Sequence, residues 1–198
     1  MELPLIPDPD RPLDTRNPLV MVVPNVLTPA QCRAWVERIE AAGPEPAPVT
    51  TSRGFVMMPG LRNNTRVMFD DAPFAARLFD ALAPHLPRRL EGEWEACGAN
   101  ERLRCYRYAP GQFFGPHFDG AFHRTDDEQS LLTLMVYLND CEAGGHTLFH
   151  DLELAVTPRP GTALIFNHHL RHEGAPVKAG LKYAVRSDVM FRRVRASL

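Results

Sequence analysis

The sequence predicts a mainly β protein with flanking helices (α+β), in which a helical layer packs on a β-sandwich or barrel. Helix-start signals and apolar stripes with helical spacing occur before residue 90. From residue 101 onward, about eight short runs place apolar side chains at every second position, which is the period of a β-strand. Turn residues separate these runs, among them Pro110-Gly111, Gly144-Gly145 and Pro160-Gly161.

The first expected helix lies in the stretch TPAQCRAWVERIEAAG. Thr28 can cap this helix, Pro29 suits its first turn, and Gln31 completes a capping box. Its apolar side chains form one stripe, followed by a glycine that stops the helix: Cys32, Trp35, Val36, Ile39 and then Gly43.

The second expected helix runs from about Asp71 to His85. Its spacing turns four apolar side chains inward, namely Phe74, Leu78, Phe79 and Leu82. Between the two helices, residues 44–66 are expected to form irregular loop with short strands.

One domain with an N-terminal arm is expected. Residues 1–24 are rich in proline and acidic side chains, which indicates an arm lying on the body of the domain. Residues 25–198 form the single domain, with the helical layer at 25–90 and the strand-rich core at 100–195. The sequence contains no internal repeat and no low-complexity segment.

Strand alternation predicts which side chains share a face. In the last run one face is apolar and the other carries polar groups, the latter being Lys182, Ala184, Arg186, Asp188 and Met190. Two earlier runs also have a face with polar side chains: Thr133 and Tyr137 in one, and Arg104, Tyr106 and Tyr108 in the other. A barrel whose mouth holds a ligand would explain three such faces.

The composition is that of an ordinary globular protein, with 44% hydrophobic and 23% charged residues. A net charge of −2 gives no support for a large nucleic-acid footprint. The four cysteines, at positions 32, 97, 105 and 141, form no C-x-x-C motif, which indicates free thiols in a reducing compartment. We find no signal peptide and no apolar run of membrane-spanning length, and therefore expect a cytoplasmic protein.

A candidate metal motif lies in the stretch GPHFDGAFHR, where His117 and Asp119 stand one residue apart. An H-x-D triplet alone is weak, because eight histidines and twelve aspartates would produce about half of one by chance. His172 is the favoured third ligand, since it follows a strand and lies ten residues before Lys182. His168 or His169 in its place remains an alternative. Two histidines and one carboxylate are the ligands of non-haem Fe(II) oxygenases, whereas structural zinc normally has four ligands.

The sequence resembles the Fe(II)/2-oxoglutarate-dependent oxygenases, and within them the prolyl 4-hydroxylase-like group. Three segments carry the resemblance, in the expected order and spacing over residues 102–191: RLRCYRYAPGQFFGPHFDG, then LTLMVYLND followed by GGHTLF, and PRPGTALIFNHHLRHEGAPVKAGLKYAVRSDVMF. The start PNVLTPAQC is similar to the group's N-terminal helix. The resemblance implies a double-stranded β-helix (jelly roll) core with the N-terminal helices packed on one sheet, and a single oxygenase domain over residues 25–198.

The resemblance also implies roles for individual residues. His117, Asp119 and His172 would be the iron ligands and the catalytic centre. Lys182 would pair with the distal carboxylate of 2-oxoglutarate, and three further side chains would bind or line the cosubstrate pocket: Tyr137, Tyr108 and Thr133. The implied cofactors are Fe(II) and 2-oxoglutarate, with a need for ascorbate left open.

Two arginines are candidates for substrate contact. Arg186 lies four residues after Lys182 on the same strand face, where it would bind an acidic substrate, share the 2-oxoglutarate carboxylate, or pair with Asp188. Arg124 follows the metal loop, with a solvated surface charge as the alternative. One departure from the group is His146, which stands where relatives often carry an acidic residue.

The implied function is hydroxylation of a small molecule or a peptidyl side chain by O2, with release of succinate and CO2. Relatives that halogenate lack the metal-binding carboxylate, so Asp119 favours hydroxylation. An oxidative nucleic-acid demethylase is an alternative, suggested by the spacing of Arg186 and Arg192, although Lys182 and the net charge argue against it. A second alternative is a non-catalytic, cupin-like binding or sensing module. Substrate identity and oligomeric state are not encoded in any motif.

Overall fold

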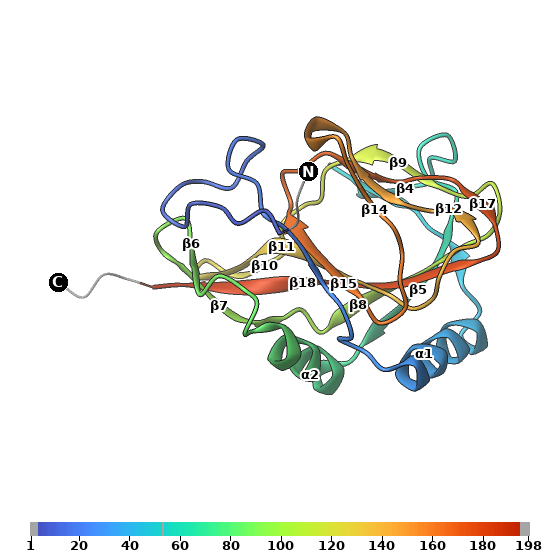
Figure 1. Ribbon diagram of the computed structural model, residues 1–198, viewed down its shortest axis with the longest axis horizontal. Helices are drawn as coiled ribbons and strands as arrows, with labels where there is room; N and C mark the ends of the chain where they lie inside the picture. The colour runs from blue at the N-terminus through green and yellow to red at the C-terminus, as the bar shows by residue number, and fades with distance from the viewer. Residues whose placement is uncertain (1–3, 53, 195–198) are drawn as a thin grey trace.

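The computed structural model describes residues 4–52 and 54–194, so residues 1–3 of the predicted arm, residue 53, and residues 195–198 of the predicted domain lie outside it. In the described part, two helices cover one face of a large antiparallel sheet, and a smaller sheet lies over the opposite face (Figure 1). This arrangement confirms the predicted mainly β architecture with helices on one sheet. No helix of the described residues is long and apolar enough to cross a membrane.

The large sheet has the strand order β1-β15-β11-β18-β8-β5-β2. The bounds of these strands are Val20–Val23, Ala163–Asn167, Glu128–Tyr137, Lys182–Arg193, Arg102–Tyr108, Thr65–Asp70 and Glu45–Pro46, in that order. Three more strands extend it, namely β10 (His123–Thr125) beside β11, β7 (Trp94–Ala99) beside β18, and β6 (Arg89–Leu90) beside β7.

The smaller sheet has the order β14-β13-β16-β9, with bounds Leu154–Val156, Thr147–Phe149, His172–Gly174 and Phe114–His117. A 3-10 turn, η1 (His150–Leu152), separates β13 from β14. Two short ribbons complete the described strands: β12 (Ala143–Gly144) with β17 (Val177–Ala179), and β3 (Val49–Thr51) with β4 (Gly54–Val56).

Helix α1 (Pro29–Ala41) forms as its start signal predicts. The Thr28 hydroxyl accepts the backbone N–H of Gln31, and the Gln31 side chain accepts the backbone N–H of Thr28, which completes the capping box. Helix α2 (Ala72–Leu82) is capped by the carboxylate of Asp71. It ends three residues before the predicted limit at His85, because Pro84 lacks the N–H that would continue the helical hydrogen bonds.

Two segments differ from the sequence-based expectation. Val20–Val23, at the end of the predicted arm, is the edge strand β1, which pairs with β15 and is mostly buried. Its four apolar residues suit a strand, but the prolines around them obscure the pattern. The expected helical layer also supplies β5 (Thr65–Asp70), whose burial alternates only weakly. These strands widen the large sheet beyond the predicted core.

Apolar side chains pack on both faces of the large sheet. On one face they meet the two helices, through residues that include Trp35, Ile39, Leu78, Val185 and Val189. On the other face they meet the smaller sheet, through residues that include Tyr137, Phe149, Leu164, Phe166 and Ala184. The alternation predicted for β18 therefore holds, and its polar residues face the space between the two sheets.

Candidate metal centre

Three candidate ligands converge at one end of the smaller sheet. His117 is the last residue of β9, His172 is the first of β16, and the two residues are direct partners across these antiparallel strands. Asp119 follows His117 by two residues. The Nε2 atom of His117 lies 3.8 Å from Oδ1 of Asp119, and the Nε2 atom of His172 lies 3.5 Å from Oδ2. One potential ligand atom from each residue lies within 4.8 Å of the others, close enough to share a metal ion.

Backbone carbonyls orient both imidazole rings. The Nδ1 atom of His117 donates to the carbonyl oxygen of Gly115 at 2.8 Å, and the Nδ1 atom of His172 donates to that of Leu170 at 2.9 Å. A carbonyl oxygen only accepts, so Nδ1 carries the proton and Nε2 keeps its lone pair for a metal. Burial, together with the neighbouring His172, lowers the pKa of His117 to about 4, which keeps this ring neutral at physiological pH.

Asp119 is held by a chain of hydrogen bonds from the large sheet. The hydroxyl of Thr133 donates to Oδ2 of Asp119 at 2.6 Å and accepts from Nδ1 of His168 at 3.0 Å. The Nε2 atom of His168 in turn accepts from the Ser130 hydroxyl at 2.9 Å. This direction requires a neutral His168, and burial indeed lowers its pKa to about 4. Thr133 therefore fixes the orientation of the carboxylate as well as lining the cavity.

Asp119 is ionised because the guanidinium group of Arg186 lies beside it. Burial alone would raise its pKa, but the positive charge of Arg186, with smaller contributions from the two nearby imidazoles, outweighs burial and lowers the pKa below its usual value. The Nη2 atom of Arg186 lies 3.2 Å from Oδ1 of Asp119. The candidate centre is thus an anionic oxygen beside two neutral nitrogen donors, a donor set that fits a divalent metal such as Fe(II).

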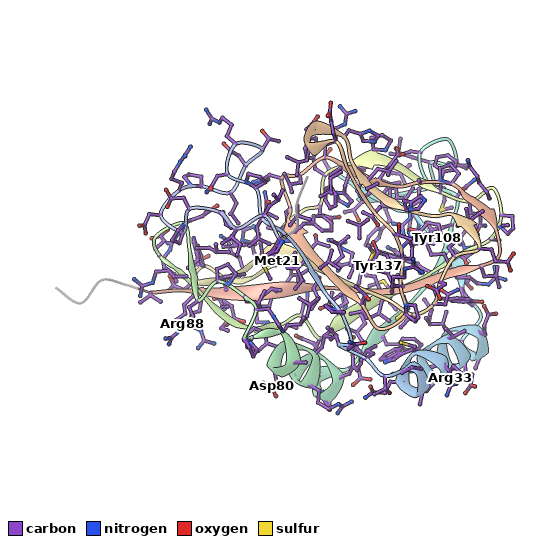
Figure 2. All side chains as sticks on the ribbon, in the orientation of Figure 1. Met21, Arg33, Asp80, Arg88, Tyr108 and Tyr137 are labelled. Atoms are coloured by element: carbon purple, nitrogen blue, oxygen red, sulfur yellow. The ribbon has the colours of Figure 1, made fainter. Side chains whose placement is uncertain are left out.

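A small cavity opens beside this centre, between the two sheets. Its polar lining comes from both sheets: Tyr106, Tyr108, His117, Asp119, Thr133, Thr147, His172, Lys182 and Arg186. Its apolar lining includes Phe114, Met135 and Phe166. Figure 2 shows Tyr108 and Tyr137 in this interior region. A few convergent polar groups beside apolar walls are typical of a small-molecule site.

Lys182 carries a buried positive charge at this cavity. It begins β18, is only 2% exposed, and its Nζ donates to the carbonyl oxygen of Gly145 at 2.6 Å. Among the described residues no carboxylate pairs with it. Burial lowers its pKa to about 8, and the ring centres of Tyr108 and Tyr137 lie 5.2 and 5.6 Å from Nζ. A buried ammonium group without a counter-ion is costly, so the site suits an anionic ligand.

The remaining predicted pocket residues lie near this ammonium group. The hydroxyl of Tyr137 is 2.7 Å from the Thr147 hydroxyl, which comes from the smaller sheet. Tyr108 lines the cavity and is 4% exposed. Burial raises the pKa of both tyrosines, so both hydroxyls stay protonated and can donate hydrogen bonds.

The two candidate arginines lie in different places. Arg186 lines the cavity and pairs with both Asp119 and Asp188, the latter at 3.1 Å. Arg124 does not line this cavity. It pairs with Glu128 at 2.6 Å and with Glu101, which corresponds to the alternative of a surface charge.

The other histidines do not replace His172. His168 supports Asp119 from behind through Thr133, and His169 bonds to the carbonyl oxygen of Leu13. His146 contacts the hydroxyl of Thr157. The acidic residue that relatives often carry at this position is therefore replaced by a histidine with a neutral partner. The demethylase alternative gains no support, because the exposed Arg192 pairs with Glu128 and does not line the cavity.

Several lining residues were not predicted as site residues. Tyr106 shares a strand face with Tyr108, so alternation alone could have identified it. Thr147 and Phe166 also lie on strands, but no motif distinguishes them from core residues. Arg62 lies beside this cavity without lining it, because an isolated bridge pairs it with Phe114, and no sequence pattern indicates that bridge.

Comparison with known proteins agrees with this geometry. Residues 103–187 match the family model of the 2OG-Fe(II) oxygenase superfamily. A stretch of 115 residues is 30% identical to a putative prolyl 4-hydroxylase of Acanthamoeba polyphaga mimivirus, covering 49% of this chain and 47% of that protein. A stretch of 97 residues is 32% identical to the prolyl 4-hydroxylase subunit alpha-2 of Gallus gallus, covering 42% of this chain and 18% of the relative. The chain thus spans less than half the length of both relatives.

The fold is also that of a solved relative. The structure superposes on the collagen prolyl hydroxylase of Paramecium bursaria Chlorella virus-1, solved as its 2OG complex, with a TM-score of 0.58, 22% identity, and coverage of 87% of this chain and 96% of that one. Fold and site define a jelly-roll protein with a two-histidine, one-carboxylate centre. The predicted resemblance is confirmed: residues 103–187 match the 2OG-Fe(II) oxygenase superfamily, and the chain is similar to prolyl 4-hydroxylases.

Proposed function

We propose that the chain is an Fe(II)- and 2-oxoglutarate-dependent dioxygenase that hydroxylates a small molecule or a peptidyl side chain, releasing succinate and CO2. One observation carries the proposal. A buried ammonium group without a carboxylate partner among the described residues, that of Lys182, shares a cavity with a His-Asp-His cluster. A dicarboxylate with a chelating keto-acid end would satisfy both groups at once.

Different residues of the chain would then bind the metal ion and the 2-oxoglutarate. His117, Asp119 and His172 would hold Fe(II) on one side, leaving positions for the keto acid and O2. Lys182 would pair with the distal carboxylate, and the protonated hydroxyl of Tyr137 would donate a hydrogen bond to it. With Fe(II) and 2-oxoglutarate bound, the centre supplies oxidative decarboxylation and transfer of one oxygen atom to a substrate C–H bond.

The surrounding residues fix the orientation of the three proposed metal ligands. Thr133 holds one oxygen of Asp119, and Arg186 contacts the other, so the carboxylate cannot rotate freely. Phe114 stacks on His117 with ring centres 3.5 Å apart, and Phe166 packs on His172 at 4.5 Å. These aromatic rings fix the imidazoles and exclude water from one side of the centre. The carboxylate of Asp119 would occupy a metal position that halide needs, which favours hydroxylation.

The experiment is to measure succinate release from 2-oxoglutarate by the chain with Fe(II), ascorbate and air, against a pool of metabolites and peptides. We expect release that a substrate stimulates, with a product heavier by one oxygen atom, and no release by His117→Ala. Omitting ascorbate shows whether it is required. A protein that neither releases succinate nor binds 2-oxoglutarate would instead be the cupin-like module.

The remaining expectations accompany this proposal. The partners would be O2 and a small-molecule or peptidyl substrate, and the weakly acidic chain argues against nucleic acid. A cytoplasmic location stays a prediction from the four cysteines, all free thiols.

A further inference from the structure

A second hollow adjoins the metal centre, and Lys182 does not line it. His117, Asp119 and Arg186 border both this outer cleft and the inner cavity. The β3–β4 hairpin contributes Val49 and Thr50 to its rim. A substrate that reaches the metal from outside has this cleft as its binding surface.

Four arginines line the outer cleft: Arg62, Arg66, Arg104 and Arg186. Strand register places three of them on one face of the large sheet. Arg66 on β5 lies directly opposite Tyr106 on β8, and Arg104 on β8 lies directly opposite Arg186 on β18. Because residues two apart on a strand share a face, Arg104 points to the same side as Tyr106. The cluster thus spans three adjacent strands beside the metal centre.

Carboxylates neutralise only part of this charge. Asp188, 1% exposed, binds Nη1 of Arg104 at 3.2 Å and Nη2 of Arg186 at 3.1 Å, which allows these two cations to face each other. Asp188 lies behind the lining, and among the described residues the only carboxylate that lines the cleft is that of Asp119, a proposed metal ligand. Four guanidinium groups therefore face two carboxylates, and a bound divalent metal would add further positive charge.

Two of the arginines lack an acidic partner within the described residues. Arg62 is 4% exposed; its Nε donates to Oδ1 of Asn64 at 2.7 Å and its Nη1 to the carbonyl oxygen of Pro48 at 3.4 Å, while its Nη2 is buried without a hydrogen-bond partner. Arg66 is half-buried and makes only a distant contact with the ring of Phe55, 5.7 Å away. A buried donor without an acceptor is costly, which indicates that a ligand supplies the acceptor.

The field of these cations extends across the cleft. Burial would raise the pKa of Tyr106, but the charges of Arg186, Arg62 and Arg104 outweigh burial and lower it. Burial is the main cause that lowers the pKa of Arg66; Tyr106 opposes it, and the like charges of Arg62 and Arg104 add to it. The lowered pKa of Tyr106 is consistent with the excess of arginines over carboxylates in the cleft, which an incoming anion would offset.

We propose that the outer cleft recognises a substrate by an anionic oxygen group, a carboxylate or a phosphate, bound by Arg62, Arg66 and Arg104. The rest of the substrate then extends toward the metal centre. Planar guanidinium groups donate paired hydrogen bonds to such oxygens. The anion is distinct from 2-oxoglutarate, because these three arginines do not line the cavity that contains Lys182. The inference rests on the proposed oxygenase function and names its substrate class.

The test is equilibrium dialysis of the protein loaded with Mn(II) and N-oxalylglycine, a non-reacting mimic of 2-oxoglutarate. The dialysed mixture contains carboxylates, phosphates and the matched neutral amide of each carboxylate, and bound compounds are read by mass spectrometry. We expect enrichment of anions over their amides, and the compounds retained show whether carboxylate or phosphate is preferred. Arg66→Gln and Arg104→Gln should each reduce the enrichment about tenfold, and Arg66→Lys should reduce it less.

Arg33→Gln is the matched control, since it removes the same charge from the exposed outer surface of α1, on the far side of the large sheet (Figure 2). Equal retention of acids and amides, no retention of any anion, or equal effects of the Arg33, Arg66 and Arg104 substitutions would overturn the inference. Failure of the wild-type protein to load Mn(II) and N-oxalylglycine would instead count against the proposed function.

Discussion

At the scale of single residues, Asp119 connects the metal centre with both hollows. Its carboxylate is bonded by Thr133 from the inner side and by Arg186, which borders the outer cleft. Because it lies in the segment after β9, its removal changes no strand pairing. Asp119 is thus the residue at which metal binding can be separated from folding.

Asp119→Ala should weaken Fe(II) binding by more than about tenfold, because it removes the only anionic ligand. Anaerobic calorimetry with Fe(II) measures this loss, and circular dichroism should show an intact fold. Asp70→Ala, which removes a surface carboxylate paired with Arg102, is the control. Iron affinity equal to that of the wild type would refute the ligand assignment.

Lys182→Met should stabilise the ligand-free protein while abolishing 2-oxoglutarate binding. Burial lowers the pKa of Lys182 from 10.5 to about 8, so its charged form is disfavoured in the folded state. At pH 7 this costs up to about 3 kcal/mol, an upper bound, which the substitution would relieve. Urea unfolding at neutral pH measures the difference, and a less stable Lys182→Met protein would contradict the account.

The same residue predicts a pH dependence. Between pH 8 and 10.5 the unfolded chain holds the Lys182 proton and the folded chain does not, so this group makes the wild type more stable as pH rises. Lys182→Met should lack that increase. The two stability curves should therefore converge toward pH 10.5, and parallel curves would show that the ammonium group is not buried at a cost.

Short motifs made the metal-ligand candidates predictable from sequence, whereas Arg62 was not. His117 and Asp119 lie in one tripeptide, and strand alternation pointed to Lys182. Arg62 lies in an irregular segment and reaches the cleft through a bridge formed only in the folded chain. Its function depends on three-dimensional neighbours that periodicity does not encode.

At the scale of elements, two short connections place the site. The β9–β16 pairing sets the two imidazoles opposite each other, and the Gly144-Gly145 turn between β12 and β13 places a carbonyl oxygen on Lys182. Gly145 has φ +70, and a Cβ there would lie 3.0 Å from Sγ of Cys141 and 3.3 Å from Cδ of Lys182. This turn therefore requires glycine for both its backbone and its surroundings.

Gly145→Ala should weaken 2-oxoglutarate binding, because the added methyl group displaces Lys182. Gly43→Ala is the matched control: it has φ +66, and a Cβ there meets nothing within 4 Å. Both substitutions should cost about 1 kcal/mol of stability through backbone strain. The affinity for N-oxalylglycine in the presence of Mn(II), measured by calorimetry, should fall only for Gly145→Ala. Equal affinities of Gly145→Ala and Gly43→Ala would show that the turn does not position Lys182.

The elements themselves were predictable where a local signal was complete. The capping box at Thr28 predicted helix α1, and the alternation of side chains in β18 predicted the two faces of that central strand. β1 and β5 were not predicted as strands of the main sheet, because proline-rich surroundings hide one and weak burial alternation hides the other. Their positions follow from pairing with distant strands.

At the scale of the whole molecule, the site lies between two sheets and both contribute to it. The large sheet supplies Lys182, Thr133 and Arg186, and the smaller sheet supplies His117 and His172. A ligand that contacts both groups binds only the folded chain, in which the sheets face each other. Ligand binding and global stability are therefore coupled.

Mn(II) with N-oxalylglycine should raise the melting temperature of the wild-type protein. At a ligand concentration one hundred times the dissociation constant, the folded state gains about 2.7 kcal/mol. For a chain of this size that gain corresponds to roughly 5–10 °C. Differential scanning calorimetry measures the shift, Asp119→Ala should show little of it, and a wild-type protein with no shift would indicate that the ligands do not bind together.

A crystal structure of the protein with Mn(II) and N-oxalylglycine tests the central claim most directly. We expect one metal ion bonded to His117, Asp119 and His172, with the distal carboxylate of the mimic on the ammonium group of Lys182. A metal held by other residues, or a mimic whose carboxylate lies away from Lys182, would contradict the account.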